Sequence, residues 1–199
     1  YLIDHEGNVR YVHFGEGDYE QTEKAIRQLL IEAGYKVSGG ITNDTPITTQ
    51  GPSRLTPETY LGSARMQFYF PNGSLPTGMA ELKAEIALPT GSFSLGGKWM
   101  IGEEYSQAQP GAILLQHFNA GKVFLVLRPT DAPHRLVKVY LDGDLVTNER
   151  AGEDVVDGSL KIYEDRLYRI INLRGAGGTH VLRLEFPDGG VEVYAFTFG

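Results

Sequence analysis

Paired acidic residues are the first feature of this sequence that could carry chemistry. Two carboxyl groups on either side of a glycosidic bond can supply the acid and the base for its hydrolysis. The sequence contains three such pairs, Glu103-Glu104, Asp142 with Asp144, and Asp154 with Asp157. The ordinary alternative is that the aspartates form turns, in which their side chains accept hydrogen bonds from nearby backbone. We favour the turns, so a glycoside hydrolase fragment is the third function that we consider.

The same acidic loops contain the type of ligand that calcium prefers. Calcium takes about six to eight oxygen ligands, and Asp142, Asp144 and Asp154 could supply several of them. The spacing of an EF-hand loop is absent, and the five histidines are scattered without an HExxH pattern. We therefore expect no cofactor, with a structural calcium ion at these aspartates as the alternative.

The only tryptophan lies in a segment that could bind a sugar. An exposed indole ring flanked by polar groups can stack on the C–H face of a sugar. Trp99 is followed by Glu103 and Tyr105, and we predict these three residues as ligand contacts. The alternative is a core tryptophan, because large aromatic side chains usually supply buried area. Solvent exposure of Trp99 would distinguish the two.

The absence of cysteine restricts the chemistry that this chain can perform. The sequence contains no cysteine, which excludes disulfides, thiolate zinc sites and a cysteine nucleophile in these 199 residues. There is no G-x-S-x-G motif and no phosphate-binding loop, so glycine pairs such as Gly96-Gly97 are interpreted as turns. We do not expect the isolated chain to be an enzyme.

Charge and hydropathy exclude several classes of partner. The formal net charge is −7, whereas nucleic acids and anionic membranes require a basic surface. No apolar run approaches the roughly 18 residues of a membrane-spanning helix, and the first residues do not resemble a signal peptide. We therefore expect a soluble module with an uncharged ligand.

The first 34 residues change from a strand pattern to a helix pattern. Tyr1–Asp4 and Val9–Phe14 are short β-like runs on either side of a turn. After Asp18, apolar residues recur at helical spacing, and Gly34 follows at the expected helix end. A hairpin and one helix bury very little, so this segment must pack against something else.

The rest of the chain shows a connector followed by strands. Residues 36–63 contain most of the proline and glycine turn signals, which predicts a linker. From residue 64 onward, short β-like runs alternate with turns rich in proline, glycine and aspartate, which predicts an antiparallel β-sandwich. The predicted strands are Ala64–Phe70, Glu85–Leu88, Phe93–Leu95, Ala112–Phe118, Val123–Arg128, Leu136–Leu141, Leu160–Tyr163, Leu167–Leu173, His180–Phe186 and Val191–Phe198.

Two sets of residues resemble known families. Tyr1-Leu2-Ile3-Asp4, Val9-Arg10-Tyr11 and the segment Phe14 to Tyr19 resemble the last two strands and last helix of a TlpA-like thioredoxin domain. A second set resembles the C-terminal region of DipZ-like cytochrome c biogenesis and thiol–disulfide proteins. This set comprises Thr56 to Gly62, Arg65, Gly96 to Trp99, Leu141 to Gly143, Arg166 to Tyr168 and Tyr194 to Gly199.

The resemblance implies a domain order and a location. It implies a C-terminal ββα remnant of a thioredoxin fold at 1–35, a linker at 36–63, and a jelly-roll sandwich similar to carbohydrate-binding modules at 64–199. It also implies an extracytoplasmic location, in the periplasm or cell envelope, and a parent protein that acts in cell redox homeostasis. The Cys-x-x-Cys helix of that family has no counterpart here, so no catalytic residue is carried over.

These observations give two leading hypotheses of different classes. The first is a non-catalytic C-terminal module of a thiol–disulfide oxidoreductase that binds an oligosaccharide. The second is a structural appendage, or a homodimerisation module, with Trp99 buried and no ligand site. In both, the missing N-terminal half of the thioredoxin domain is the expected partner of residues 1–34, because it would cover an otherwise exposed sheet edge and helix face.

Overall fold

A computed structural model describes residues 1–12, 19–39, 55–130 and 134–199. The chain divides into two compact units, Tyr1–Pro52 and Ser53–Gly199. The end of the second predicted β-run, Asp18 at the start of the helical spacing, and most of the predicted linker lie outside the described residues.

The first unit contains a hairpin and a helix, as the sequence predicts. Strands β1 (Leu2–Ile3) and β2 (Val9–Tyr11) pair antiparallel, and helix α1 spans Tyr19–Glu32. The carboxylate of Asp4 closes the hairpin turn by accepting hydrogen bonds from the backbone N–H groups of Glu6 and Asn8. An aspartate side chain that accepts such bonds from the following backbone favours a tight turn of the chain.

Apolar side chains of the first unit remain exposed. Gly34 has a φ of 85° and ends the helix, as expected. A groove of about 300 Å³ runs between the hairpin and α1, lined by Ile26, Leu29 and Leu30 among others. Ile3 and Ile31 are 60% and 62% exposed. The described part of this unit therefore leaves an apolar surface open to solvent.

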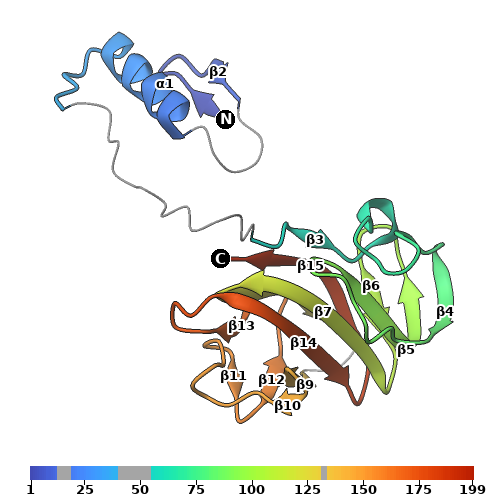
Figure 1. Cartoon of the computed structure of the whole chain (residues 1–199). Coiled ribbons are helices and arrows are strands. Elements are labelled where there is room, and N and C mark those ends of the chain that lie inside the picture. The colour runs from blue at the N-terminus through green and yellow to red at the C-terminus, as the bar shows by residue number, and fades with distance from the viewer. Residues whose placement is uncertain (13–18, 40–54, 131–133) are drawn as a thin grey trace. The chain divides into compact units, whose positions relative to one another are not determined.

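The second unit is built from short antiparallel strands (Figure 1). Its elements are β3 (Thr59–Tyr60), the 3-10 helix η1 (Ser63–Arg65), β4 (Gly78–Leu82), β5 (Phe93–Ile101), β6 (Ser106–Ala108), β7 (Ala112–Ala120), β8 (Lys122–Pro129), β9 (Arg135–Leu141), β10 (Asp144–Leu145), β11 (Val155–Val156), β12 (Ser159–Ile162), β13 (Arg166–Asn172), β14 (Gly178–Phe186) and β15 (Val191–Phe198).

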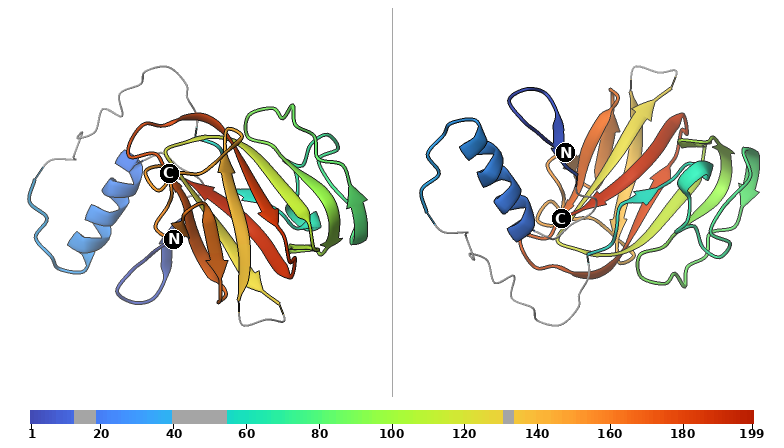
Figure 2. Two further views of the ribbon diagram at one scale, coloured as in Figure 1. Left: turned by 90° about the horizontal axis from the view of Figure 1, so that it is seen from below. Right: turned by 90° about the horizontal axis from the view of Figure 1, so that it is seen from above.

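These strands form two layers. In the layer that we call the β14 sheet, the order is β11, β12, β9, β14, β7 and the first half of β5, with β10 paired to β9. In the β15 sheet, the order is β4, the second half of β5, β6, β15, β8 and β13, with β3 paired to β15. Strands that are distant in the sequence therefore lie side by side, such as β6 and β15 (Figures 1 and 2). The predicted antiparallel β-sandwich is confirmed.

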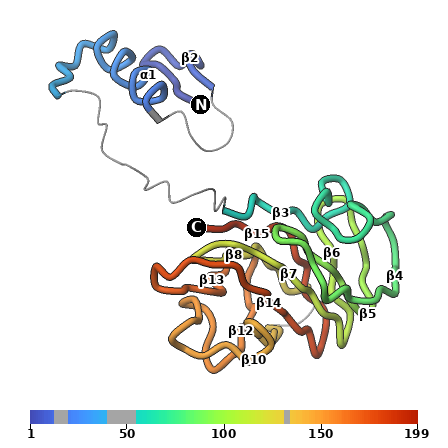
Figure 3. Tube along the Cα trace, viewed as in Figure 1, coloured from blue at the N-terminus to red at the C-terminus, as the bar shows by residue number. Residues whose placement is uncertain are grey.

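Strand β5, labelled in Figure 3, belongs to both layers. It passes from one layer to the other at Gly96-Gly97. Gly97 has a φ of 78°, a conformation that L side chains rarely adopt. A Cβ atom on Gly96 would lie 2.8 Å from the Cβ atom of Ala84. The prediction of a turn at this pair was wrong, because the two glycines bend a continuous strand instead of ending it.

The core lies between the two layers. Leu182, Leu184 and Phe186 of β14 are fully buried, as their alternation with polar residues predicts. Val191 and Val193 of β15 contribute to the same core from the facing layer. Each such side chain stabilises the fold by roughly 1.5–3 kcal/mol through removal of apolar surface from water.

Two predicted strands are wrong, and five strands of two to five residues, β3, β4, β6, β10 and β11, were not predicted. Residues 64–70 form the end of η1 and turns, in which Tyr69 makes only an isolated bridge to Phe93. The buried side chains there are Met66 and Tyr69, which are three residues apart. A strand would bury every second side chain, so this spacing is not that of a strand. Residues 85–88 are also outside any strand. Strand β4 was missed because its sequence, GMAEL, lacks β-branched and aromatic residues.

The sandwich begins before the predicted boundary at residue 64. Thr59–Tyr60 pairs with β15, and the backbone N–H of Leu61 donates to the carbonyl of Tyr194. The Leu61 side chain is fully buried in the core. The last residues of the predicted linker are therefore part of the folded unit. The sequence did not predict this strand, because it has only two residues and lies beside prolines that indicate a loop.

We predict that Gly97→Ala destabilises the second unit by about 1–2 kcal/mol, because alanine pays a steric cost at positive φ. Chemical denaturation followed by circular dichroism measures the change. Gly121→Ala is the matched control, since a Cβ atom there would meet nothing closer than 3.5 Å. Equal effects of the two substitutions would show that the corner at Gly97 is not constrained.

Candidate functional site

Trp99 is a core residue in the structure. Its side chain is fully buried, and its ring packs edge to face on Phe186 with the centroids 5.5 Å apart. The indole Nε1–H donates to the carbonyl oxygen of Gly96 over 2.9 Å. This hydrogen bond satisfies the one polar group of the indole inside the core. The ring therefore presents no face to solvent on which a sugar could stack.

Tyr105, the second predicted contact, lies at the surface. It is half-buried and its ring is 5.4 Å from that of Tyr194. The hydroxyl of Tyr194 donates to the carboxylate of Glu192 over 2.7 Å, and Arg128 lies 3.8 Å from the same carboxylate oxygen. Glu103 is exposed. The structure thus separates the predicted set, with Trp99 inside and Tyr105 and Glu103 outside.

The Tyr194 hydroxyl remains protonated over the whole physiological range. Partial burial and the hydrogen bond to Glu192 raise the pKa of Tyr194 to about 12. The opposing effect of Arg128 is smaller. Tyr194 therefore acts as a neutral hydrogen-bond donor that holds Glu192 in place on the outer face of the β15 sheet.

A cleft of about 410 Å³ lies elsewhere in the second unit, between residues 67–73 and 89–92. Three consecutive aromatic residues, Phe68, Tyr69 and Phe70, line it with prolines on both sides. Polar groups are supplied by the amide of Gln67 and the hydroxyls of Thr90 and Ser92. The cleft has no charged side chain among its lining residues. This combination of apolar walls with a few neutral polar groups is typical of a ligand site.

The walls of the cleft are fixed by β5. The backbone N–H of Phe70 donates to the carbonyl of Phe93, and the N–H of Phe93 donates to the carbonyl of Phe68. The Tyr69 ring packs edge to face on Phe93, with the centroids 5.5 Å apart. The hydroxyl of Ser92 donates its hydrogen to the carbonyl of Pro89. The lone pairs of the Ser92 oxygen remain available as hydrogen-bond acceptors. The sequence pattern did not predict the cleft, because it predicts a strand at 64–70, where the structure has turns.

The first predicted calcium ligand, Asp142, already has cationic and backbone partners. One carboxylate oxygen lies 2.7 Å from His180 Nδ1 and 3.2 Å from the Arg150 guanidinium, and the other accepts from the N–H of Val181. Burial opposes ionisation, but these hydrogen bonds outweigh it and lower the pKa of Asp142. Asp144 is exposed on β10 and has no side-chain hydrogen bond among the described residues.

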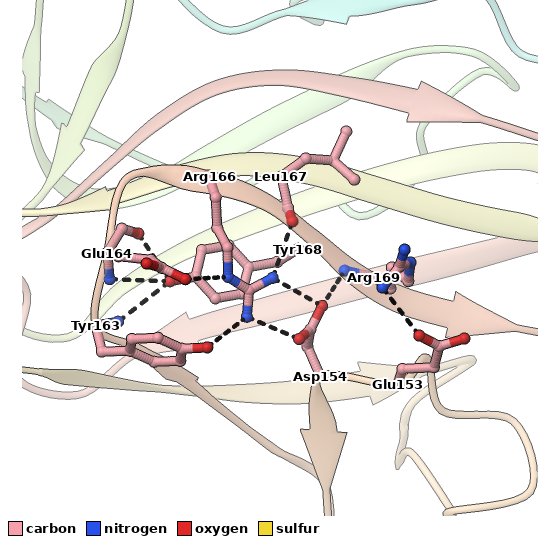
Figure 4. A network of polar contacts seen from close by, with 8 residues as sticks. All are labelled: Glu153, Asp154, Tyr163, Glu164, Arg166, Leu167, Tyr168 and Arg169. Carbon is pink, nitrogen blue, oxygen red and sulfur yellow. Dashed lines mark hydrogen bonds and ion pairs between the residues drawn. The ribbon is translucent and has the colours of Figure 1, made fainter.

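Asp154, the third predicted ligand, is the centre of a polar network (Figure 4). Arg166 donates to both of its carboxylate oxygens, over 2.8 and 3.2 Å, and the N–H of Arg169 donates to one of them over 2.7 Å. The Arg166 guanidinium stacks 3.9 Å from the ring centre of Tyr168 and also donates to the Tyr163 hydroxyl. The network joins the loop before β11 to β13, which is a structural role.

Arg166 holds Asp154 in its ionised form. Burial alone would raise the pKa of Asp154, but the hydrogen bonds from Arg166 and Arg169 lower it below the ordinary value. The paired carboxylate raises the pKa of Arg166 in return. The bidentate partner therefore uses both oxygens of the carboxylate in a structural ion pair.

The three aspartates do not converge on one site. Among the residues that the structure describes, no group of three or more His, Asp or Glu side chains is placed to hold a metal ion. No described cleft is lined by two carboxylates either, whereas acid–base hydrolysis of a glycoside requires a facing pair. Neither the calcium ion nor the glycosidase hypothesis gains support from the geometry.

The family of the chain follows from a comparison with protein-family models. The model described as "Thioredoxin like C-terminal domain" matches residues 56–199, which include every strand of the second unit. The chain belongs to this family. The match begins at the residue before Pro57, in agreement with a sandwich that starts ahead of residue 64.

Two curated relatives match the whole chain. They are the Protein DipZ of Mycobacterium bovis and that of Mycobacterium tuberculosis, each 34% identical over 207 aligned residues. The alignments cover 100% of this chain and 26% of each relative. This member of the thioredoxin-like C-terminal domain family therefore spans about a quarter of the length of these relatives. The resemblance to DipZ-like proteins inferred from the sequence is confirmed.

Solved structures show more distant similarity to this family member. A family two carbohydrate esterase from Cellvibrio japonicus is 9% identical, with a TM-score of 0.42. The match covers 71% of this chain and 33% of the esterase chain. The C-terminal CBM6 of LamC, a marine laminarinase from Zobellia galactanivorans, is 10% identical with a TM-score of 0.30, at 70% and 97% coverage. At these scores neither structure assigns a ligand.

The described residues contain no helix with the length and hydrophobicity of a membrane span.

We predict that Asp154→Asn lowers the free energy of unfolding at pH 7 by about 1–3 kcal/mol, through the loss of charged hydrogen bonds. Because the folded pKa of Asp154 lies below its unfolded value, its contribution is present above the unfolded pKa near 4 and disappears as the pH falls through the folded pKa. Urea denaturation at pH 7 and at pH 3 measures this difference.

The exposed Asp144→Asn is the matched control for this prediction, with an expected change within about 0.5 kcal/mol. The wild-type protein and the Asp154→Asn variant should approach one another in stability at the lower pH. A constant difference between them at both pH values would contradict the assigned role of the Asp154 carboxylate.

Proposed function

We propose that this chain is a non-catalytic C-terminal part of a DipZ-like thiol–disulfide oxidoreductase, and that its second unit binds a neutral carbohydrate. The family match and the 34% identity to DipZ over the whole chain support the first part. The absence of cysteine supports a non-catalytic role, because thiol–disulfide exchange requires a thiolate. As in the DipZ-like proteins that the chain resembles, we place the module outside the cytoplasm.

The observation that supports carbohydrate binding is the cleft between residues 67–73 and 89–92. Aromatic rings bind the C–H faces of sugars, while amide and hydroxyl groups hydrogen-bond to sugar hydroxyls. Phe68 and Phe70 are half-buried, so part of each ring is accessible at the cleft. Gln67, Thr90 and Ser92 supply the neutral polar groups beside them.

Charge favours a neutral sugar over an acidic one. The chain has a net charge of −7, and no arginine or lysine lines the cleft. A uronic or phosphorylated sugar would therefore lose the hydration of its anionic group without gaining a cationic partner. We propose neutral oligosaccharides as the ligand class.

For the first unit, we propose that residues 1–35 complete a thioredoxin-like domain. The apolar groove between the hairpin and α1, together with the exposed Ile3 and Ile31, is the surface that a further part of such a domain would cover. Burial of exposed apolar side chains is the main source of stability in a small domain. The N-terminal half of such a domain is therefore the proposed partner.

A structural appendage without a ligand is the second candidate. It is favoured by Trp99, whose complete burial removes the aromatic platform that the sequence suggested. In that case the second unit positions or dimerises the redox domain. Sedimentation velocity would show whether the chain forms the homodimer that this alternative includes.

We predict that at least one neutral oligosaccharide from a panel of glucans, mannans and xylans binds the chain, and that Phe70→Ala weakens the affinity about tenfold or more. Phe70 is outside the core cluster, so its truncation removes a cleft wall and leaves the fold intact. Isothermal titration calorimetry measures both affinities, and circular dichroism confirms the folding of the variant.

Tyr105→Ala is the matched aromatic control, because Tyr105 is a surface tyrosine outside the cleft. An unchanged affinity in this variant, together with the loss in Phe70→Ala, would support the cleft. The reverse pattern would assign the site to Tyr105 and Glu103 instead. The absence of binding to every sugar in the panel would favour the structural appendage.

A further inference from the structure

Thioether groups are the only sulfur groups of this chain. The sequence contains no cysteine and three methionines, Met66, Met79 and Met100. Hydroperoxides oxidise exposed thioethers to sulfoxides, whereas a buried thioether is protected by the surrounding protein. The positions of these three residues therefore determine where two-electron oxidants act on the chain.

Two of the methionines form a cross-strand pair at the surface. Met79 of β4 is directly opposite Met100 of β5, and the two side chains are 61% and 38% exposed. Residues directly opposite each other in an antiparallel pair project from the same face of the sheet. Trp99, adjacent to Met100, is buried on the opposite face. Both thioethers thus lie side by side on the outer face of the β15 sheet.

The surroundings of the pair suit a polar product. Glu81 and Lys98 are the next cross-strand pair on the same face, with their charged groups 3.7 Å apart and both exposed. Gln107 of β6 is opposite Met100 on the other side. A sulfoxide oxygen is a hydrogen-bond acceptor. The ammonium of Lys98, diagonal to Met79, and the amide of Gln107, opposite Met100, are hydrogen-bond donors at distances that long side chains can span.

Met66 provides an internal contrast. It is 1% exposed and belongs to the core cluster. Oxidation there would place a polar, chiral group inside a packed core, which requires opening of the fold. The same chain therefore contains two thioethers that are open to oxidants and one that is closed to them.

We propose that Met79 and Met100 form a reversible oxidation site on the outer face of the β15 sheet. A hydroperoxide transfers one oxygen atom to the thioether sulfur, which is oxidised by two electrons to a sulfoxide, while the O–O bond breaks and the hydroperoxide is reduced to an alcohol or to water. A methionine sulfoxide reductase restores the thioether: a pair of thiols is oxidised to a disulfide, and the sulfoxide oxygen leaves as water. The reaction converts an apolar surface pair into a polar one and leaves the core unchanged.

Hydrogen peroxide treatment of the full chain, followed by peptide mapping with mass spectrometry, tests the proposal. We expect Met79 and Met100 to gain one oxygen each at a rate at least about tenfold above that of Met66. Treatment in guanidinium chloride serves as the control, because the three rates should become similar once the fold is lost. The melting temperature of the oxidised folded protein should be unchanged.

Addition of methionine sulfoxide reductases of both stereochemical classes to the folded, oxidised chain should restore Met79 and Met100. The variant Met79→Leu with Met100→Leu should take up almost no oxygen while folded. The proposal is overturned if Met66 reacts as fast as the pair in the folded chain, if the pair resists peroxide, or if its sulfoxides are not reduced.

Discussion

The burial of Trp99 at the point where β5 changes layers is the constraint on which the rest of the sandwich depends. Gly96 and Gly97 allow the strand to bend, and the indole returns a hydrogen bond to the carbonyl of Gly96 while its ring packs on Phe186. This contact joins the two layers across the core. Because one strand pairs with β7 before the corner and with β4 and β6 after it, β5 is shared by the two layers.

The same constraint decides where a ligand can bind. With the indole used by the core, the aromatic surface of the second unit consists of other residues, and the concave part of it is the cleft beside Phe93, the first residue of β5. Phe93 holds the cleft walls through backbone hydrogen bonds on both sides of Tyr69. One strand therefore forms both features: β5 bends at Gly96-Gly97 to join the two layers, and its first residue, Phe93, supports the walls of the cleft.

The sequence predicted those features that depend on regular patterns. Alternation in β14 and the helical spacing before Gly34 were sufficient to predict that strand and α1. The missed features depend on contacts between distant residues. Pairing of Thr59–Tyr60 with β15 involves too few residues for a pattern, and the cleft at Phe68–Phe70 requires Phe93. Burial of Trp99 could not be decided, because an indole beside glycines and charges suits both a core and a sugar platform. The aspartates Asp142 and Asp154 had arginine partners that no spacing revealed.

The most direct test is a titration of the isotope-labelled chain with neutral oligosaccharides, followed by nuclear magnetic resonance of the backbone amides and of the single indole N–H. Our account predicts that amide shifts cluster at residues 67–73 and 89–92, while the indole resonance of Trp99 remains unchanged because its hydrogen bond to Gly96 is inside the core. Saturable shifts that centre on the Trp99 indole and on Tyr105, with a silent cleft, would contradict it.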